Sequence, residues 1–205
     1  MSWRLLGEVF VTVLFIIDPP GNVPIFLSVT RALSPKERNQ AALVAVSTAF
    51  LVIGLFAIGG RQVLEYLGVT VPALRASGGL LLLLVSLELL SGREASAVAE
   101  MTPQQRTSIA MVPLGTPLLA GPGAIVATIV FVGRSAGPRD LLAIALGLMA
   151  TMLVTFLALR FSGLIMRAIR PTGVLLVSRV SGMLVAAIAV QMIADAVRDF
   201  INAGP

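Results

Sequence analysis

Six apolar runs, each close to the length that crosses a lipid bilayer, constrain this chain more than any other feature of its sequence. The runs occupy residues 8–30, 41–60, 72–92, 108–133, 140–161 and 173–195. A transmembrane helix needs about 20 consecutive apolar residues, because a helix of that length matches the hydrocarbon core. The sequence therefore predicts an all-α membrane protein with six transmembrane helices.

The amino-acid composition excludes an ordinary soluble domain. Hydrophobic residues make up 57% of the 205 residues and charged residues only 12%, and the mean hydropathy is +0.98. A soluble protein of this length needs more charge on its surface, whereas a surface that faces lipid needs none. We therefore expect membrane lipid to be the main partner of the outer surface.

The residue types also exclude several kinds of function. The net charge of +5 does not indicate a nucleic-acid partner, because the basic residues lie mostly between apolar runs, where they set membrane topology. The chain has no cysteine and no histidine, which excludes thiol chemistry, Ser–His catalysis and His-ligated zinc. A phosphatase built from carboxylates and arginines stays open, although no cluster of basic residues marks a phosphate site. We expect no enzymatic activity, no metal and no cofactor.

Two of the apolar runs, the first and the fourth, contain breaks rich in proline and glycine. The breaks lie at residues 18–24 (DPPGNVP) and 121–124 (GPGA). Proline removes a backbone donor and clashes with the preceding turn, and glycine permits non-helical angles. Broken helices are tolerated at membrane depth only where they are buried in protein or line a cavity. We expect helices 1 and 4 to be broken at these motifs and to line such a cavity.

The chain also contains a weak internal repeat. Pro20-Gly21 recurs as Pro122-Gly123, and residues 75–81 (RASGGLL) recur as residues 179–185 (RVSGMLV) at nearly the same distance. Each unit has three spans, so the second unit must insert upside down. Paired broken helices in inverted repeats are typical of transporters with a site at the bilayer midplane. A single membrane domain, 1–205, is predicted, with repeat one at about 8–92, a polar connector at about 93–107 and repeat two at about 108–197.

Arginine and lysine are unequally divided between the two ends of six spans. One end has five basic residues and the other has eight, and the richer end is expected to be cytoplasmic. Both termini would then be periplasmic or external. The predicted location is the bacterial inner membrane, with multiple passes.

Two motifs resemble one family of membrane proteins. Residues 18–27 (DPPGNVPIFL) and residues 112–125 (VPLGTPLLAGPGAI) are similar to motifs of the MarC family of bacterial and archaeal integral membrane proteins. Pro20 and Gly115 depart from the usual pattern. The resemblance implies a relation to amino-acid exporters of the LysE type, and some members of the family are described as neutral amino-acid transporters.

Five candidate substrate-binding residues lie in the two breaks. Asp18 is the one carboxylate well inside an apolar run, where a charge costs about 2.5–3.5 kcal/mol on insertion scales. It is either a site for a proton, a cation or a substrate ammonium, or a cap for the helix that follows, and the two roles are compatible. Gly21, Asn22, Gly121 and Gly123 lie where half-helices restart. Their amides either bind a substrate carboxylate or serve close helix packing.

Two further candidate substrate-binding residues are Thr116 and Arg179. Thr116 either donates to substrate or bonds back to its own helix beside Pro117. Arg179 and its repeat partner Arg75 either act as gates or extend to the membrane interface.

The sequence leaves two classes of function open. The first is a secondary transporter of small neutral amino acids or similar metabolites, coupled to H⁺ or Na⁺ by alternating access, with Asp18 as the coupling residue. The second is a membrane protein without solute transport, which handles lipid or assists assembly. Glu88 and Asp195, near the ends of the third and sixth spans, are expected on solvated faces. Substrate, direction of transport and oligomeric state are not set by any motif.

Overall fold

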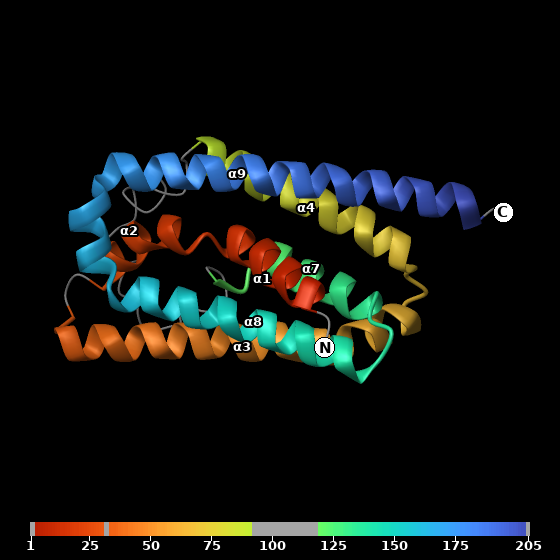
Figure 1. Ribbon diagram of the computed structural model, residues 1–205, viewed down its shortest axis with the longest axis horizontal. Coiled ribbons are helices and arrows are strands. Elements are labelled where there is room, and N and C mark those ends of the chain that lie inside the picture. Colours follow the sequence, from red (N-terminus) through yellow and green to blue (C-terminus); the bar gives the residue numbers. More distant parts are fainter. Residues whose placement is uncertain (1–2, 31–32, 92–118, 204–205) are drawn as a thin grey trace.

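The chain is helical throughout the part that the computed structural model describes, which comprises residues 3–30, 33–91 and 119–203. These residues form seven helices and no strand (Figure 1). The helices are α1 (Trp3–Ile17), α2 (Pro19–Val29), α3 (Pro35–Tyr66), α4 (Val71–Ser91), α7 (Pro122–Gly133), α8 (Pro138–Arg160) and α9 (Ser162–Ala203). The prediction of an all-α protein is confirmed.

Five segments are long and apolar enough to cross a membrane. They are Trp3–Leu27, which joins α1 and α2, and Pro35–Gly60, Pro72–Ser91, Pro138–Arg160 and Thr172–Asn202. The fourth predicted span, 108–133, is described only from residue 119, where Gly123–Gly133 forms a shorter apolar helix. The predicted connector, 93–107, lies outside the described residues. A multi-pass membrane protein is therefore confirmed, whereas six spans and their division into two repeats stay predictions.

Local sequence signals explain where several helices begin. Ser34 and Glu37 form a capping box before α3, since the Ser34 amide donates to Glu37 Oε2 at 2.8 Å and the Glu37 amide donates to Ser34 Oγ at 3.4 Å. Helices α7 and α8 each begin with proline directly after a glycine. Proline suits this position because the first helical amide has no partner within the helix.

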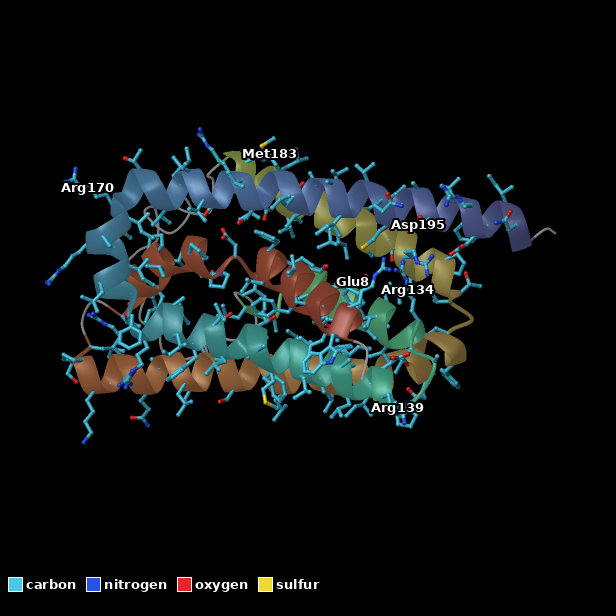
Figure 2. The ribbon with its side chains drawn as sticks, in the orientation of Figure 1. Glu8, Arg134, Arg139, Arg170, Met183 and Asp195 are labelled. Carbon is cyan, nitrogen blue, oxygen red and sulfur yellow. The ribbon has the colours of Figure 1, made fainter. Side chains whose placement is uncertain are left out.

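Helices α1 and α7 form the centre of the bundle. Val9, Val13 and Ile16 of α1 are buried, and so are Ala127 and Val130 of α7. Around them, α1 packs on α8, α7 packs on both α3 and α4, and α2 packs on α9. The outer faces of α3, α8 and α9 expose large apolar side chains, such as Met183 (Figure 2), as expected for contact with lipid.

Helices α4 and α9 pack against each other along much of their length, and glycine makes the close approach possible (Figure 1). A Cβ on Gly79 of α4 would lie 2.8 Å from the Ala189 carbonyl oxygen of α9. A Cβ on Gly182 of α9 would lie 3.1 Å from the Ser86 carbonyl oxygen of α4. The contact partners descend along α9 as they ascend along α4, so the two helices are antiparallel. Small residues at helix contacts are the usual basis of tight packing in membranes.

The tight α4–α9 contact generates a stability prediction. Gly79→Val should lower the unfolding temperature in detergent, because its side chain meets Ile193 and Ala189, and overpacking costs about 1–3 kcal/mol. Gly54→Val is the matched control, since nothing lies within 4 Å of a Cβ at that position. Thermal unfolding followed by size-exclusion chromatography measures both variants. Equal unfolding temperatures would contradict a tight contact at Gly79.

Candidate functional site

The first predicted break is a single residue, Asp18, between α1 and α2. Its backbone has φ 45° and ψ 66°, in the left-handed region that asparagine and aspartate tolerate better than most residues. The Asp18 amide donates to Leu14 O at 3.0 Å, and Asp18 O accepts from the Asn22 amide at 3.1 Å. Asp18 therefore closes one helix and opens the next, and it turns the chain between them.

Asn22 holds this break together through its side chain. Its Nδ2 donates to Ile17 O at 2.5 Å and lies 3.3 Å from Asp18 O. An unsatisfied carbonyl at membrane depth would cost several kcal/mol, and the Ile17 carbonyl lies where the regular helix pattern is interrupted. The side-chain amide nitrogen of Asn22 thus donates to backbone carbonyls, and this role is structural.

The start of α2 offers few bare amides. Pro19 and Pro20 occupy its first two positions and have no N–H, and the Asn22 amide is bonded to Asp18 O. Gly21 has the remaining amide, which faces the Asp18 carboxylate. A Cβ on Gly21 would collide with that carboxylate and lie 2.7 Å from Ser178 Oγ. The end of α2 that would attract an anion is therefore already beside a negative group.

The Asp18 carboxyl group is buried, with only 2% of the residue exposed. The hydroxyls of Ser178 and Ser181 on α9 face it, but neither carboxyl oxygen has a partner with hydrogen-bond geometry among the described residues. It also makes no side-chain cap for α2. A buried carboxyl group without partners is costly, and such groups inside membranes usually serve a proton, a cation or a ligand.

The second break precedes α7 and differs in chemistry. Gly121 is extended, with φ −61° and ψ 160°, and its carbonyl accepts from the amides of Ala124 at 3.1 Å and Ile125 at 3.3 Å. Pro122 has no N–H, so the Gly123 amide is the bare donor at the start of α7. The position that matches Asp18 in the repeat is Ala120, so this break has no carboxylate of its own. This helix start keeps its preference for an anion.

The two breaks meet at one cavity of about 300 Å³. Helix α4 supplies the third wall with mostly apolar side chains and one carboxylate. The lining residues are Ile16, Ile17, Asp18, Asn22, Leu81, Leu84, Val85, Glu88, Leu89, Leu119, Gly121, Gly123 and Ala124. A cavity of this size is at the lower end of the range of about 300–1,000 Å³ for small-molecule sites.

Four of the seven predicted substrate-binding residues line this cavity, namely Asp18, Asn22, Gly121 and Gly123. Gly21 lies behind the Asp18 carboxylate. Thr116 lies outside the described residues. Arg179 is exposed on α9 and does not line the cavity.

Three polar residues near the site were not among the predicted substrate-binding residues. Ser178 and Ser181 are one turn apart on α9, so they share the inward face while Arg179 between them points elsewhere. Glu88 was expected on a solvated face, and its side chain is exposed, but it also lines the cavity. The cavity thus extends from Asp18 toward the C-terminal end of α4. The i, i+3 spacing of the serines is the signal that sequence reasoning had for them.

Arg75, the repeat partner of Arg179, does not pair with Asp18. Its side chain is largely buried and forms an ion pair with Asp199 near the end of α9. This pair joins α4 to α9 at the opposite end of α4 from Glu88. Arg75 thus has a structural partner away from the helix breaks.

The comparisons with known proteins identify relatives that are membrane proteins. A family model described as MarC family integral membrane protein matches residues 3–201. A UPF0056 membrane protein of Methanocaldococcus jannaschii is 32% identical over 92% of this chain and 94% of its own length. One from Archaeoglobus fulgidus is 34% identical over 91% of this chain and 89% of its own. UPF0056 membrane protein YvbG of Bacillus subtilis is 27% identical over 94% of each. No solved structure matches the chain.

The two glycines of the second break should respond differently to substitution. Gly121→Ala should keep the unfolding temperature, because nothing lies within 4 Å of a Cβ there and its angles suit any residue. Gly123→Leu should lower it by several degrees, since even a Cβ would lie 2.7 Å from Leu82 Cδ2 and 3.3 Å from Ile16 Cγ2. Thermal unfolding of both variants in detergent tests the difference. A Gly123→Leu protein with an unchanged unfolding temperature would show that Leu82 and Ile16 can move aside. Close helix packing would then not require glycine at this position.

Proposed function

Because the chain belongs to the MarC family of integral membrane proteins, we propose that it is a secondary transporter of small neutral amino acids or similar metabolites. The observation that carries the proposal is the cavity between the two helix breaks. Its wall contains the buried Asp18 carboxyl group, which has no hydrogen-bonding partner among the described residues. The proposed mechanism is alternating access about this cavity. The protein acts as a carrier and performs no chemistry on its solute.

The unlike charges of the two breaks support a zwitterionic solute. Asp18 offers a carboxylate for an ammonium group, and the start of α7 offers the Gly123 amide and the positive end of a helix dipole for a carboxylate. Between them, Leu81 and Val85 leave an apolar wall for a small side chain. No arginine or lysine lines this cavity among the described residues, which disfavours a solute with a net negative charge.

Asp18 is also the proposed coupling residue. Proton or sodium binding at Asp18 would neutralise its charge when no solute ammonium is bound, which lowers the cost of moving that charge through a closed state. Ser178 and Ser181 supply neutral oxygen atoms close to the carboxylate, which suits either ion.

The proposed architecture is six spans in two inverted repeats, with both termini outside the bacterial inner membrane. The helix contacts support it, because they keep the same pattern when the repeats are exchanged. Helix α7 is the counterpart of α2, since both follow a break. Contact of α2 with α8 corresponds to contact of α7 with α3, and contact of α2 with α9 corresponds to contact of α7 with α4. Contacts of α3 with α8 and of α4 with α9 correspond to themselves.

A lipid-handling role is the second candidate, and one observation favours it. An apolar groove of about 630 Å³ lies between α3 and α8 on the outer face, lined by residues such as Phe50, Ile58, Met152 and Phe156. Such a groove fits acyl chains. It is open and almost free of polar groups, however, so it offers no recognition of a headgroup.

Counterflow in proteoliposomes tests the transport proposal without knowledge of the coupling ion. Vesicles preloaded with small neutral amino acids receive labelled glycine, alanine or serine outside, and exchange alone drives the label inward. We expect saturable uptake of label that requires internal solute. Folded and reconstituted protein that gives no uptake would contradict the neutral amino-acid proposal and favour lipid.

Asp18→Asn should keep the protein folded but reduce ion-driven accumulation roughly tenfold or more, because the amide cannot carry the negative charge that a cation or ammonium needs. Asp140→Asn is the matched control, since the Asp140 carboxylate accepts from the Ala136 amide in the turn before α8 and does not line the cavity. Accumulation is measured under an imposed proton or sodium gradient. Equal accumulation by Asp18→Asn and wild type would exclude Asp18 from coupling.

A further inference from the structure

A second polar cavity lies between α1, α7 and α9. Its volume is about 370 Å³, and its polar lining consists of Glu8, Thr12, Arg134, Gln191 and Asp195. Figure 2 shows Glu8, Arg134 and Asp195 gathered at one end of the bundle. The first cavity extends toward the C-terminal end of α4, and this one extends toward the C-terminal end of the antiparallel α9. The two cavities therefore face opposite ends of the bundle.

Most charged groups around this second cavity already have a close partner. Arg4 Nε donates to Glu8 Oε1 at 2.9 Å, and Arg75 pairs with Asp199. Gln191 Nε2 donates to Asp195 Oδ1 at 2.9 Å. The charged groups around the cavity therefore have a net charge close to zero. A zwitterion without net charge suits such a cavity better than an ion.

Arg134 is the exception. Its Nη2 lies 3.9 Å from Asp195 Oδ2, which is too long for a hydrogen bond, and the described residues give its side chain no other partner. The side chain is 43% exposed, so it is open to a solute and yet has lost much of its water. Burial, and then the nearby Arg75, lower the pKa of Arg134, whereas Asp195, Asp199 and Glu8 raise it. A guanidinium still stays charged at neutral pH.

The geometry points to a second solute site on the other side of the membrane barrier, where Arg134 binds the carboxylate of a small zwitterion. The planar guanidinium binds a carboxylate through two parallel hydrogen bonds, which Lys cannot do. Glu8 and Asp195, from α1 and α9, flank it and are placed to receive the ammonium group. Ile188, Met192 and Phe131 form an apolar wall for the side chain. This inference rests on the proposed function and adds to it a vestibule where solute binds before or after the central cavity.

The absence of cysteine in the chain makes the site directly testable. Thr12→Cys places one thiol in the cavity wall, and a membrane-impermeant thiol reagent should modify it from one side only. Millimolar alanine should slow that modification at least fivefold. Alaninamide, which lacks the carboxylate, should not. Leu84→Cys, in the lining of the Asp18 cavity, is the control and should react from the opposite side.

Variants of Arg134 in the Thr12→Cys background separate a binding role from a structural one. Arg134→Gln should abolish protection by alanine, and Arg134→Lys, which keeps the charge, should weaken it about tenfold in alanine concentration. If Arg134→Gln does not fold, weaker protection in the Arg134→Lys variant still distinguishes a binding role from a structural one. Protection that is unchanged in both variants, or absent in the parent while counterflow persists, overturns the second site and leaves the transport proposal intact. Loss of counterflow in wild type with protection retained would instead contradict transport and leave the site.

Discussion

Every backbone polar group inside the hydrocarbon core needs a partner within the protein, and the break at Asp18 depends on how this chain meets that need. Two prolines stop the regular hydrogen bonds of α1 from continuing into α2. The side-chain amide of Asn22 replaces one of these bonds by donating to the Ile17 carbonyl at 2.5 Å. That arrangement fixes the angle between the two half-helices. The backbone amide of Asn22, which the sequence left open for a substrate carboxylate, is bonded as well, so the structure of the break and the chemistry of the site compete for Asn22.

The two breaks look alike in sequence and differ in charge. The start of α2 has its one bare amide beside the Asp18 carboxylate, whereas the start of α7 has Ala120 at the position that matches Asp18. The first break is therefore negative, and the second keeps the positive end of its helix. A duplicated motif has become two unlike half-sites, and a solute with both charges is the simplest ligand that fits them.

The sequence predicts the features that depend on local chemistry. Pro and Gly in residues 18–24 and 121–124 indicate breaks wherever they stand in a helix, and Asp18 inside an apolar run indicates a cavity or a partner. The sequence does not predict features that depend on how a helix is rotated or on which residues of other helices pack against it. Arg179 was chosen and its neighbours Ser178 and Ser181 were not, because only packing of α9 against α2 shows which face is inward. The sequence likewise does not show which of Gly121 and Gly123 is tightly packed. The structure shows it, because Leu82 and Ile16 lie against Gly123.

Asp18 has no carboxylate counterpart in the second repeat, where Ala120 stands, and this asymmetry limits how the proposed carrier can work. An inverted repeat lets the two halves exchange conformations, but a single acidic group must serve both sides of the membrane. Asp18 suits that task because it lies at the junction of two half-helices, and its carboxyl oxygens have no partner with hydrogen-bond geometry among the described residues. Two charged contacts lie at the end of the bundle that the Asp18 cavity does not face. They are the ion pair of Arg75 with Asp199 and the looser contact of Arg134 with Asp195. The Arg75–Asp199 ion pair bridges that end, and the cavity reaches Glu88 at the other, which is the arrangement that the proposed carrier would have with access from one side.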